Sequence, residues 1–319
     1  MTYKKTILVT GGAGFIGSNF LNIWVKKYPD YFFVNIDSLT YASDMSNVLV
    51  EKMENYNFQK MDIRDFNSLD LLFKEFNFTD IINFAAESHV DVSIENPKIF
   101  LETNIVGTYN LLELARKYNI KRFYQISTDE VYGSLAIDDK PFSTDSILNP
   151  SSPYSASKAS ADMLVSAYHK TYGLDTVISR STNNYGPNQD NSKFIPKFIE
   201  NLIKGEKVPL YSNGQHVRDW IYVLDHVEAI DLVFHRGISG GVYNIGSNQE
   251  FTNREVVNKL LELSGRDESY IDNVPDRLGH DFRYALDTKE MFEEFGWQAR
   301  TSFIEGIQKT FDFYKNRVR

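Results

Sequence analysis

The chain has 319 residues, 42% of them hydrophobic, and can therefore bury the core of one large domain or of two unequal ones. The absence of cysteine excludes disulfides, thiolate catalysis and Cys-ligated zinc, and the six histidines lack the close spacing of a zinc site. The net charge is -9 and the chain has no basic run, so we expect no nucleic-acid partner. It has no signal-peptide pattern and no apolar run near the roughly 20 residues that span a bilayer. We therefore predict a cytoplasmic protein without membrane or metal partners.

Apolar, β-branched runs alternate with longer amphipathic stretches through the first half of the chain. Between most of the runs, apolar residues recur at helical spacing, as in residues 68–76 and 105–118. This order predicts an α/β fold, a Rossmann-like, doubly wound parallel sheet with helices on both faces. The runs that we predict to be strands cover residues 5–11, 31–37, 57–62, 80–86, 122–128 and 175–181.

After about residue 180 this rhythm loosens. Residues 183–194 and 272–282 are predicted to be loops, whereas residues 240–247 have the pattern of one more strand. We therefore expect a dinucleotide-binding part, residues 1–180, with elements near 220–250 returning to it. Residues 181–319 should form a smaller α+β part that mainly binds the substrate.

The first predicted strand leads into TGGAGFIGS, where Gly11, Gly14 and Gly17 precede a helix. Glycine permits a tight turn there and lets the backbone approach a pyrophosphate, whose charge the helix N-terminus stabilises. Asp37 ends the second strand, where a carboxylate binds the adenosine ribose and repels the extra phosphate of NADP. The sequence therefore predicts NAD. Asp62, after the third strand, is either an adenine contact or a helix N-cap.

Tyr154 and Lys158 lie four residues apart at the start of a predicted helix and hence on one face. The ammonium and the charge of a nicotinamide can lower the pKa of the phenol, so that tyrosinate accepts a proton from a sugar hydroxyl during hydride transfer. With 19 tyrosines in the chain, about one such pair is expected by chance. Its position after the dinucleotide loop, and after a strand that ends in Ser127 and Thr128, favours the catalytic interpretation.

Two adjacent acids, Asp129 and Glu130, directly follow the predicted strand 122–128. Neighbouring carboxyls repel each other, so that one is held protonated and the pair offers an acid and a base. Consecutive residues of a strand face opposite sides, so the two can converge only if the strand has already ended. The alternative is that one carboxylate caps a loop or a helix and the other is solvated.

These motifs resemble, in order, those of the extended short-chain dehydrogenases/reductases, and most closely the dTDP-glucose 4,6-dehydratase family. The resemblance spans nearly the whole chain and rests on TGGAGFIGS, AAESHVD, STDEVYG, PSSPYSASKAS, NNYGP and DRLGHD. It implies NAD-dependent dehydration of dTDP-glucose to dTDP-4-keto-6-deoxyglucose. The reaction oxidises carbon 4, eliminates water across carbons 5 and 6, and returns hydride to carbon 6. The resemblance places this reaction in deoxysugar biosynthesis, namely that of dTDP-rhamnose.

On this resemblance we assign Tyr154 as the base for the carbon 4 hydroxyl, Asp129 as the acid for water loss and Glu130 as the base at carbon 5. Thr128 is expected to hydrogen-bond the carbon 4 oxygen, with Lys158 beside Tyr154. The predicted cofactor contacts are Gly11, Gly14, Phe15, Ile16, Gly17, Asp37, Ser38, Leu39, Thr40, Asp62, Ile63, Ala85, Ala86, Ser88, Thr103, Tyr154, Lys158 and Asn184. The predicted substrate contacts are His89, Thr128, Asp129, Glu130, Asn183, Lys193, Phe194, Pro209, Tyr211, Arg218, Asn253, Arg277 and His280.

Other functions remain open at this point. A UDP-sugar 4-epimerase or a UDP-glucuronate decarboxylase would use NAD, Thr128, Tyr154 and Lys158, but needs no acid and base aimed at carbons 5 and 6. A non-catalytic NAD-binding regulator is an alternative of another class. The resemblance also implies a homodimer through the helices predicted at 98–118 and 155–173, although burial within one chain explains their apolar faces equally well.

Overall fold

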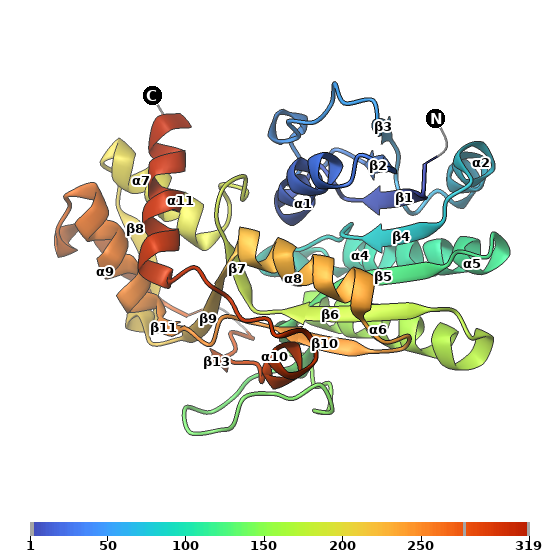
Figure 1. Cartoon of the computed structure of the whole chain (residues 1–319). Helices are drawn as coiled ribbons and strands as arrows, with labels where there is room; N and C mark the ends of the chain where they lie inside the picture. Colours follow the sequence, from blue (N-terminus) through green and yellow to red (C-terminus); the bar gives the residue numbers. More distant parts are fainter. Residues whose placement is uncertain (1–2, 277–278, 318–319) are drawn as a thin grey trace.

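The computed structural model describes residues 3–276 and 279–317. Its centre is a parallel seven-stranded sheet with the strand order β10-β6-β5-β4-β1-β2-β3 (Figure 1). Apart from the edge strand β3, the strands are largely buried on both faces, which is why their sequences are mostly apolar runs. They are β1 (Lys5–Thr10), β2 (Tyr31–Asp37), β3 (Tyr56–Lys60), β4 (Asp80–Asn83), β5 (Arg122–Thr128), β6 (Thr176–Ser181) and β10 (Val242–Ile245). The predicted doubly wound fold is confirmed.

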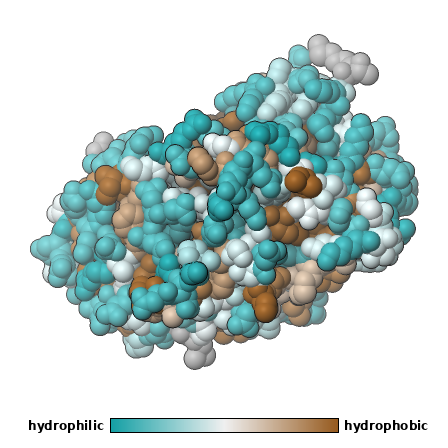
Figure 2. Space-filling view, turned by 60° about the horizontal axis from the view of Figure 1, so that its bottom comes forward, coloured by the Kyte–Doolittle hydropathy of each residue, from teal (hydrophilic) through white to brown (hydrophobic). Residues whose placement is uncertain are grey.

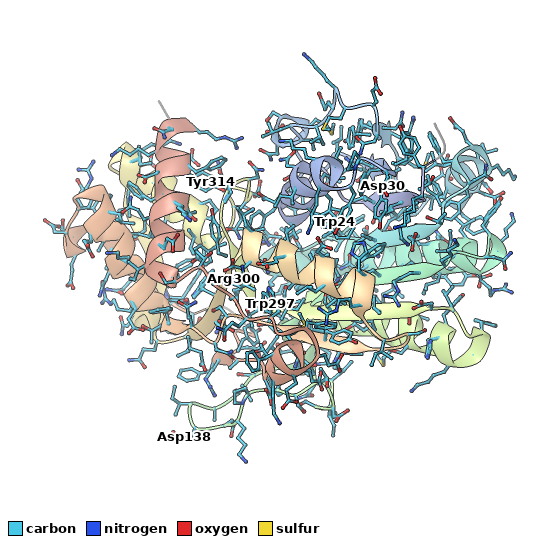
Figure 3. The ribbon with its side chains drawn as sticks, viewed as in Figure 1. Trp24, Asp30, Asp138, Trp297, Arg300 and Tyr314 are labelled. Carbon is cyan, nitrogen blue, oxygen red and sulfur yellow. The ribbon has the colours of Figure 1, made fainter. Side chains whose placement is uncertain are left out.

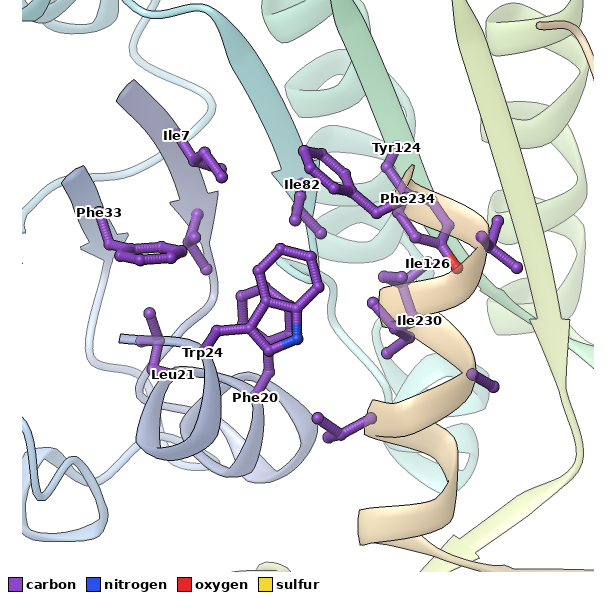
Figure 4. Packing of buried hydrophobic residues seen from close by; sticks show 14 of the residues in the cluster. Ile7, Phe20, Leu21, Trp24, Phe33, Ile82, Tyr124, Ile126, Ile230 and Phe234 are labelled. Carbon is purple, nitrogen blue, oxygen red and sulfur yellow. The ribbon is translucent and has the colours of Figure 1, made fainter. Parts of the chain in front are cut away.

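Helices cover the two faces of this sheet with separate hydrophobic clusters. On one face α1 (Phe15–Lys27), α8 (Val223–Arg236) and α10 (Lys289–Phe295) pack, and Trp24 of α1 contacts Phe20 and Phe234 (Figure 4). The other face carries α2 (Phe66–Phe76), α5 (Thr108–Lys117) and α6 (Pro153–Tyr172). The strand order reverses between β1 and β4, and a doubly wound sheet binds its ligand at the carboxyl ends of such strands.

The start of α6 is fixed by its own sequence. Ser152 is the N-cap of a capping box with Ser155, and Pro153 occupies the first turn, where its missing N–H costs no hydrogen bond. This places Tyr154 in the first turn of the helix, next to the end of β5.

A smaller lobe follows β6 and lies to the left in Figure 1. It contains two small sheets, one built around β9 and one formed by β8 and β12, and a hydrophobic cluster of its own. Its strands are β7 (Asn183–Tyr185), β8 (Val208–Tyr211), β9 (Val217–Tyr222), β11 (Glu250–Thr252), β12 (Ile271–Val274) and β13 (Arg283–Tyr284). Its helices are α7 (Phe194–Lys204), α9 (Asn253–Ser264) and α11 (Phe303–Arg317). Figure 3 shows Tyr314 of α11 far from Asp138, which lies in the long loop between β5 and α6.

Two local predictions were wrong, and a third needs refinement. The predicted loops 183–194 and 272–282 contain the short strands β7 and β12, which form by pairing with β9 and β8. The helix predicted at 98–118 is present as one continuous helical run, in which a π-helical segment, η2 (Leu101–Gly107), joins α4 (Pro97–Phe100) to α5. Such segments are frequent at functional sites.

The face shown in Figure 2 is mostly hydrophilic, with scattered hydrophobic residues. Among the described residues, no helix combines the length and the apolar character that a membrane span requires.

Candidate active site

A cleft of about 1230 Å³ of empty space lies at the carboxyl ends of β1, β2 and β4. Gly11 and Gly14 form part of its wall. Gly11 has φ +70°, and a Cβ there would lie 2.7 Å from the Cα of Ala85, so only glycine lets the loop pass the end of β4. Gly17 likewise packs against the Gly11 carbonyl, which a Cβ would approach to 2.4 Å. The loop therefore makes the tight turn that the sequence predicted.

The cleft also fits the charge of a dinucleotide. Gly14 is the N-cap of α1 and offers no capping side chain, so the first N–H groups of the helix remain available to a pyrophosphate. Asp37, 5% exposed, accepts hydrogen bonds from the backbone N–H groups of Ala13 at 3.0 Å and Leu39 at 2.8 Å, and a carboxylate has further lone pairs for a ribose. The Ser127 hydroxyl, buried in the wall, has no hydrogen-bond partner among the described residues.

Asp62 also lines this cleft and forms an ion pair with Arg64 at 2.5 Å. Its alternative role as a helix N-cap is wrong, because Asp65 caps α2 by accepting from the N–H of Ser68 at 3.1 Å. Thr103 reaches the cleft from the π-helical segment η2, and Gly107 of the same segment packs against Ile63. The π-helical segment thus lies beside the predicted cofactor contacts.

The structure brings most of the predicted cofactor residues to this one cleft. Leu39 is adjacent without lining it, and Asn184 lines the neighbouring cavity instead. The predicted residues in the wall are Gly11, Gly14, Phe15, Ile16, Gly17, Asp37, Ser38, Thr40, Asp62, Ile63, Ala85, Ala86, Ser88, Thr103, Tyr154 and Lys158. Polar wall residues that the sequence analysis did not select are Ser43, Arg64, Glu87, Ser127, Gln189 and Asp190.

Tyr154 and Lys158 meet the end of β5 from α6. The Lys158 ammonium donates to the carbonyl of Ile126 at 2.7 Å, and burial lowers its pKa to about 8. Burial, and next the charge of Glu130, raise the pKa of Tyr154 well above 10, while a hydrogen bond with Thr128 acts in the opposite direction. A further positive charge is therefore needed before the phenol can act as a base at neutral pH.

The acid pair begins immediately after β5 has ended. A 3-10 turn, η3 (Asp129–Tyr132), starts there with Thr128 as its N-cap, so the alternation of a strand no longer separates the two side chains. Asp129 is buried and its Oδ1 accepts from Thr128 at 3.1 Å, whereas Glu130 lines a second cavity. Burial, reinforced by the charge of Glu130, raises the pKa of Asp129 well above its usual value. Both effects favour the protonated form of Asp129, as its predicted role of acid requires.

The second cavity adjoins the first, because Ser88, Gln189 and Lys193 line both. The Lys193 ammonium donates to the carbonyl of Ser88 at 2.6 Å and so connects α7 with the segment after β4. The predicted substrate residues in its wall are His89, Glu130, Asn183, Lys193, Phe194, Pro209, Tyr211, Arg218, Asn253 and His280. Thr128 and Asp129 are not among the residues that line it, and Arg277 lies outside the described residues.

Several wall residues of this cavity were missed by the sequence analysis. Asp91, Ser192, Lys197 and Trp220 are among them. Trp220 carried a usable signal, because it lies two positions after Arg218 on β9 and alternate residues of a strand share a face.

Asn184 is held by a buried histidine. The Nδ1 of His226 and the Oδ1 of Asn184 are 2.8 Å apart, and burial lowers the pKa of His226 to about 3. His226 is therefore neutral and can donate its Nδ1–H to the amide oxygen, which orients the Asn184 side chain in the cavity wall.

His216, Asp276 and His280 form the one cluster of potential metal ligands found among the described residues. The two imidazoles are stacked, with ring centroids 3.6 Å apart and planes 18° from parallel, and both approach the Asp276 carboxylate. Nearly parallel rings direct their nitrogen lone pairs side by side rather than toward one point, so this geometry does not favour chelation.

Comparisons with known proteins agree with this geometry. The family model for GDP-mannose 4,6 dehydratase matches residues 8–310. A dTDP-glucose 4,6-dehydratase from Haemophilus influenzae is 44% identical, with 97% of each chain covered. The structure of the dTDP-glucose 4,6-dehydratase from Bacillus anthracis in complex with NAD superposes with a TM-score of 0.91 at 45% identity, covering 98% of this chain and 97% of that one.

A second dTDP-glucose 4,6-dehydratase, from Streptomyces venezuelae, was solved with NAD and a further ligand bound. It superposes with a TM-score of 0.93 at 43% identity and covers 98% of this chain and 97% of its own. The glycine loop, the Tyr154/Lys158 pair and the acid pair therefore lie in a chain that is similar to these enzymes over nearly its full length. The chain belongs to the family described by the GDP-mannose 4,6 dehydratase model, within which its relatives include the dTDP-glucose 4,6-dehydratases.

Proposed function

We propose that the protein is a hydro-lyase that converts dTDP-glucose to dTDP-4-keto-6-deoxyglucose with NAD as its cofactor. The observation that carries this proposal is the acid pair at the end of β5. Asp129 is buried with a raised pKa, and Glu130 reaches the cavity that adjoins the dinucleotide cleft. A proton donor and a proton acceptor side by side are what elimination of water across two adjacent carbons requires.

Each residue has one task in this reaction. Tyr154, as phenolate, accepts the proton of the carbon 4 hydroxyl, and Thr128 donates a hydrogen bond to the same oxygen. Glu130 removes the proton from carbon 5, which the ketone at carbon 4 has made acidic, and carbon 5 regains a proton when the hydride returns to carbon 6. Asp129 protonates the departing hydroxyl of carbon 6. NAD⁺ supplies the hydride acceptor for carbon 4, the later hydride donor for carbon 6 and a positive charge that favours the phenolate.

The cofactor would be held by the α1 N-terminus and the glycine loop at its pyrophosphate and by Asp37 at its adenosine ribose. Lys158, one helical turn after Tyr154 in α6, would orient the ribose next to the nicotinamide. Because the hydride is returned to the sugar, turnover consumes no net NAD, and a tightly retained cofactor serves this cycle well.

The acid pair also separates this function from its rivals. A 4-epimerase or a UDP-glucuronate decarboxylase of the same fold needs Thr128, Tyr154 and Lys158, but no proton donor and acceptor at carbons 6 and 5. A regulator without activity needs none of the three. A buried carboxyl with a raised pKa is costly to keep, so its presence beside Glu130 favours the dehydratase.

We also propose a homodimer formed by the face of η2, α5 and α6. Large hydrophobic side chains are exposed on these adjoining helices, and a second copy could cover them. They are Leu101, Val106, Tyr109, Met163 and Tyr172. Residues 1–180 would serve as the NAD-binding part and residues 181–319 mainly as the nucleotide-sugar part. A cytoplasmic location and a role in dTDP-rhamnose biosynthesis complete the proposal.

The test is incubation of purified protein with dTDP-glucose and catalytic NAD⁺, followed by product mass and by absorbance of the 4-keto product in alkali. Loss of one water without accumulation of NADH is the expected result. An unchanged mass would reject dehydration of this substrate, and the same assay with UDP-sugars would detect an epimerase or a decarboxylase.

A further inference from the structure

Arg218, which is predicted to bind the substrate diphosphate, is held in place by the segment that forms β13. In the register of β9 and β13, Tyr284 lies directly opposite Arg218, and the guanidinium carbon is 4.3 Å from the centre of the tyrosine ring. The guanidinium also donates to the carbonyls of Asp281 at 2.8 Å and Phe282 at 3.0 Å. Its orientation therefore depends on where residues 281–284 lie.

That segment is in turn tied to the catalytic helix by one carboxylate. Oδ2 of Asp281 accepts a hydrogen bond from Ser151 at 2.5 Å and another from the hydroxyl of Tyr284. Ser151 directly precedes Ser152, the N-cap of α6, whose first turn carries Tyr154. Three side chains thus connect the residue that faces the nucleotide with the start of the helix that carries the catalytic tyrosine.

The electrostatic surroundings support a connection of this kind. Burial and the charge of Glu130 raise the pKa of Tyr284 well above 10, so its hydroxyl stays protonated and remains a donor to Asp281. The charge of Arg218 acts on Asp129, whose pKa it lowers. The segment therefore lies within reach of both the diphosphate end of the cavity and the acid pair.

We propose that Tyr284 and Asp281, with Ser151, are positioning residues that orient Arg218 toward the substrate diphosphate and fix its distance from the start of α6. Through this bridge, correct placement of the nucleotide sets the position of the sugar relative to Tyr154. The inference rests on the proposed function, since it takes a nucleoside diphosphate as the ligand of Arg218.

Tyr284→Phe tests the bridge, because it keeps the ring beneath Arg218 and removes only the hydroxyl that holds Asp281. We expect the dissociation constant of thymidine diphosphate, measured by calorimetry, and KM for dTDP-glucose to rise about tenfold, as for loss of a hydrogen bond to a charged group. NAD affinity should not change. Ser151→Ala should weaken thymidine diphosphate binding by about threefold, and the double variant by more than the product of the two, because both donors share one oxygen.

Tyr185→Phe is the matched control. It removes the hydroxyl of another buried tyrosine of the same lobe, whose oxygen has no hydrogen-bond partner among the described residues. If Tyr284→Phe binds thymidine diphosphate as tightly as Tyr185→Phe does, the bridge is refuted while the proposed function stands. If the unaltered protein does not bind thymidine diphosphate, the proposed function fails first. Ser151 is exposed, so its variant decides the question even if Tyr284→Phe does not fold.

Discussion

Asparagine in place of Asp129 should make the protein more stable and less active at the same time. Asp129 is 2% exposed, and its Oδ2 has no hydrogen-bond partner among the described residues. Its pKa is raised well above the ordinary value of 3.8, chiefly by burial and then by Glu130. The folded protein consequently keeps a proton that the unfolded chain releases once the pH exceeds the ordinary carboxyl pKa.

The sign and the size of the effect follow from this difference. A carboxyl with a raised folded pKa contributes stability that is fully present below its unfolded pKa and is lost as the pH rises through its folded pKa. Within that window the contribution of Asp129 falls by up to about 1.4 kcal/mol per pH unit. Asparagine cannot ionise and can still accept the hydrogen bond from Thr128. The stability advantage of the variant should therefore grow with pH by the same slope.

Urea unfolding of the wild type and of Asp129→Asn at about pH 5 and about pH 7 measures this directly, with an expected change in their difference of roughly 2–3 kcal/mol. Dehydration of dTDP-glucose by the variant should be slower by about 10²- to 10⁴-fold, the usual contribution of a general acid. A stability difference that is the same at both pH values would mean that Asp129 is already charged in the folded protein. Its assignment as the proton donor would then be refuted.

Three further outcomes are expected. Glu130→Gln should still transfer hydride to NAD⁺ but lose water at least about 100-fold more slowly, and normal turnover would contradict its role as the carbon 5 base. NAD affinity should decline as the pH rises through about 8, because the Lys158 ammonium loses its proton there. Calorimetry at several pH values should show this dependence in the wild type and not in Lys158→Met. If the dependence persists in the variant, another group is responsible. Arg180 is 5% exposed and forms an ion pair with Asp162 at 2.9 Å. Asp162→Ala should therefore lower the free energy of unfolding, measured in urea, by about 3–5 kcal/mol. A decrease below about 1 kcal/mol would show that the pair is solvated.

Most of the central sheet could be predicted from sequence because its strands, apart from the edge strand β3, are largely buried on both faces. Such strands are continuous apolar runs, and even β10, remote in the chain, showed this pattern. The small strands of the second lobe have two to six residues and exist through pairing with a neighbour, as β13 does with β9. Their own residues carry little strand signal, which is why loops were predicted there.

The π-helical segment η2 was beyond the same reasoning for a different reason. A hydrophobic pattern with a period of 3.6 residues cannot reveal where one turn takes an extra residue, since the apolar residues on either side keep their spacing. Gly107 was the only local indication, and its close packing against Ile63 becomes visible only in three dimensions.

In the active site, the residues that could be predicted from sequence are those that belong to short contiguous motifs. The glycine loop and the Tyr154/Lys158 pair are each built by one short stretch, so their spacing is legible in the sequence. Gln189 and Ser192 were missed although they lie between the predicted contacts Asn184 and Lys193. They are presented by an irregular loop, in which neither helical nor strand periodicity tells which side chains point inward.

The late arrival of β10 has a consequence for synthesis of the protein on the ribosome. When β6 has just left the ribosome, one edge of that strand is unpaired. Its partner β10 begins at Val242, more than 60 residues after β6 ends at Ser181. Helix α8, which covers the apolar face beside α1, also comes after β6. An open strand edge next to an uncovered hydrophobic face invites aggregation. Synthesis therefore passes through a stage at which chaperone protection would matter most, and fragments that end before Val242 should be recovered largely in inclusion bodies.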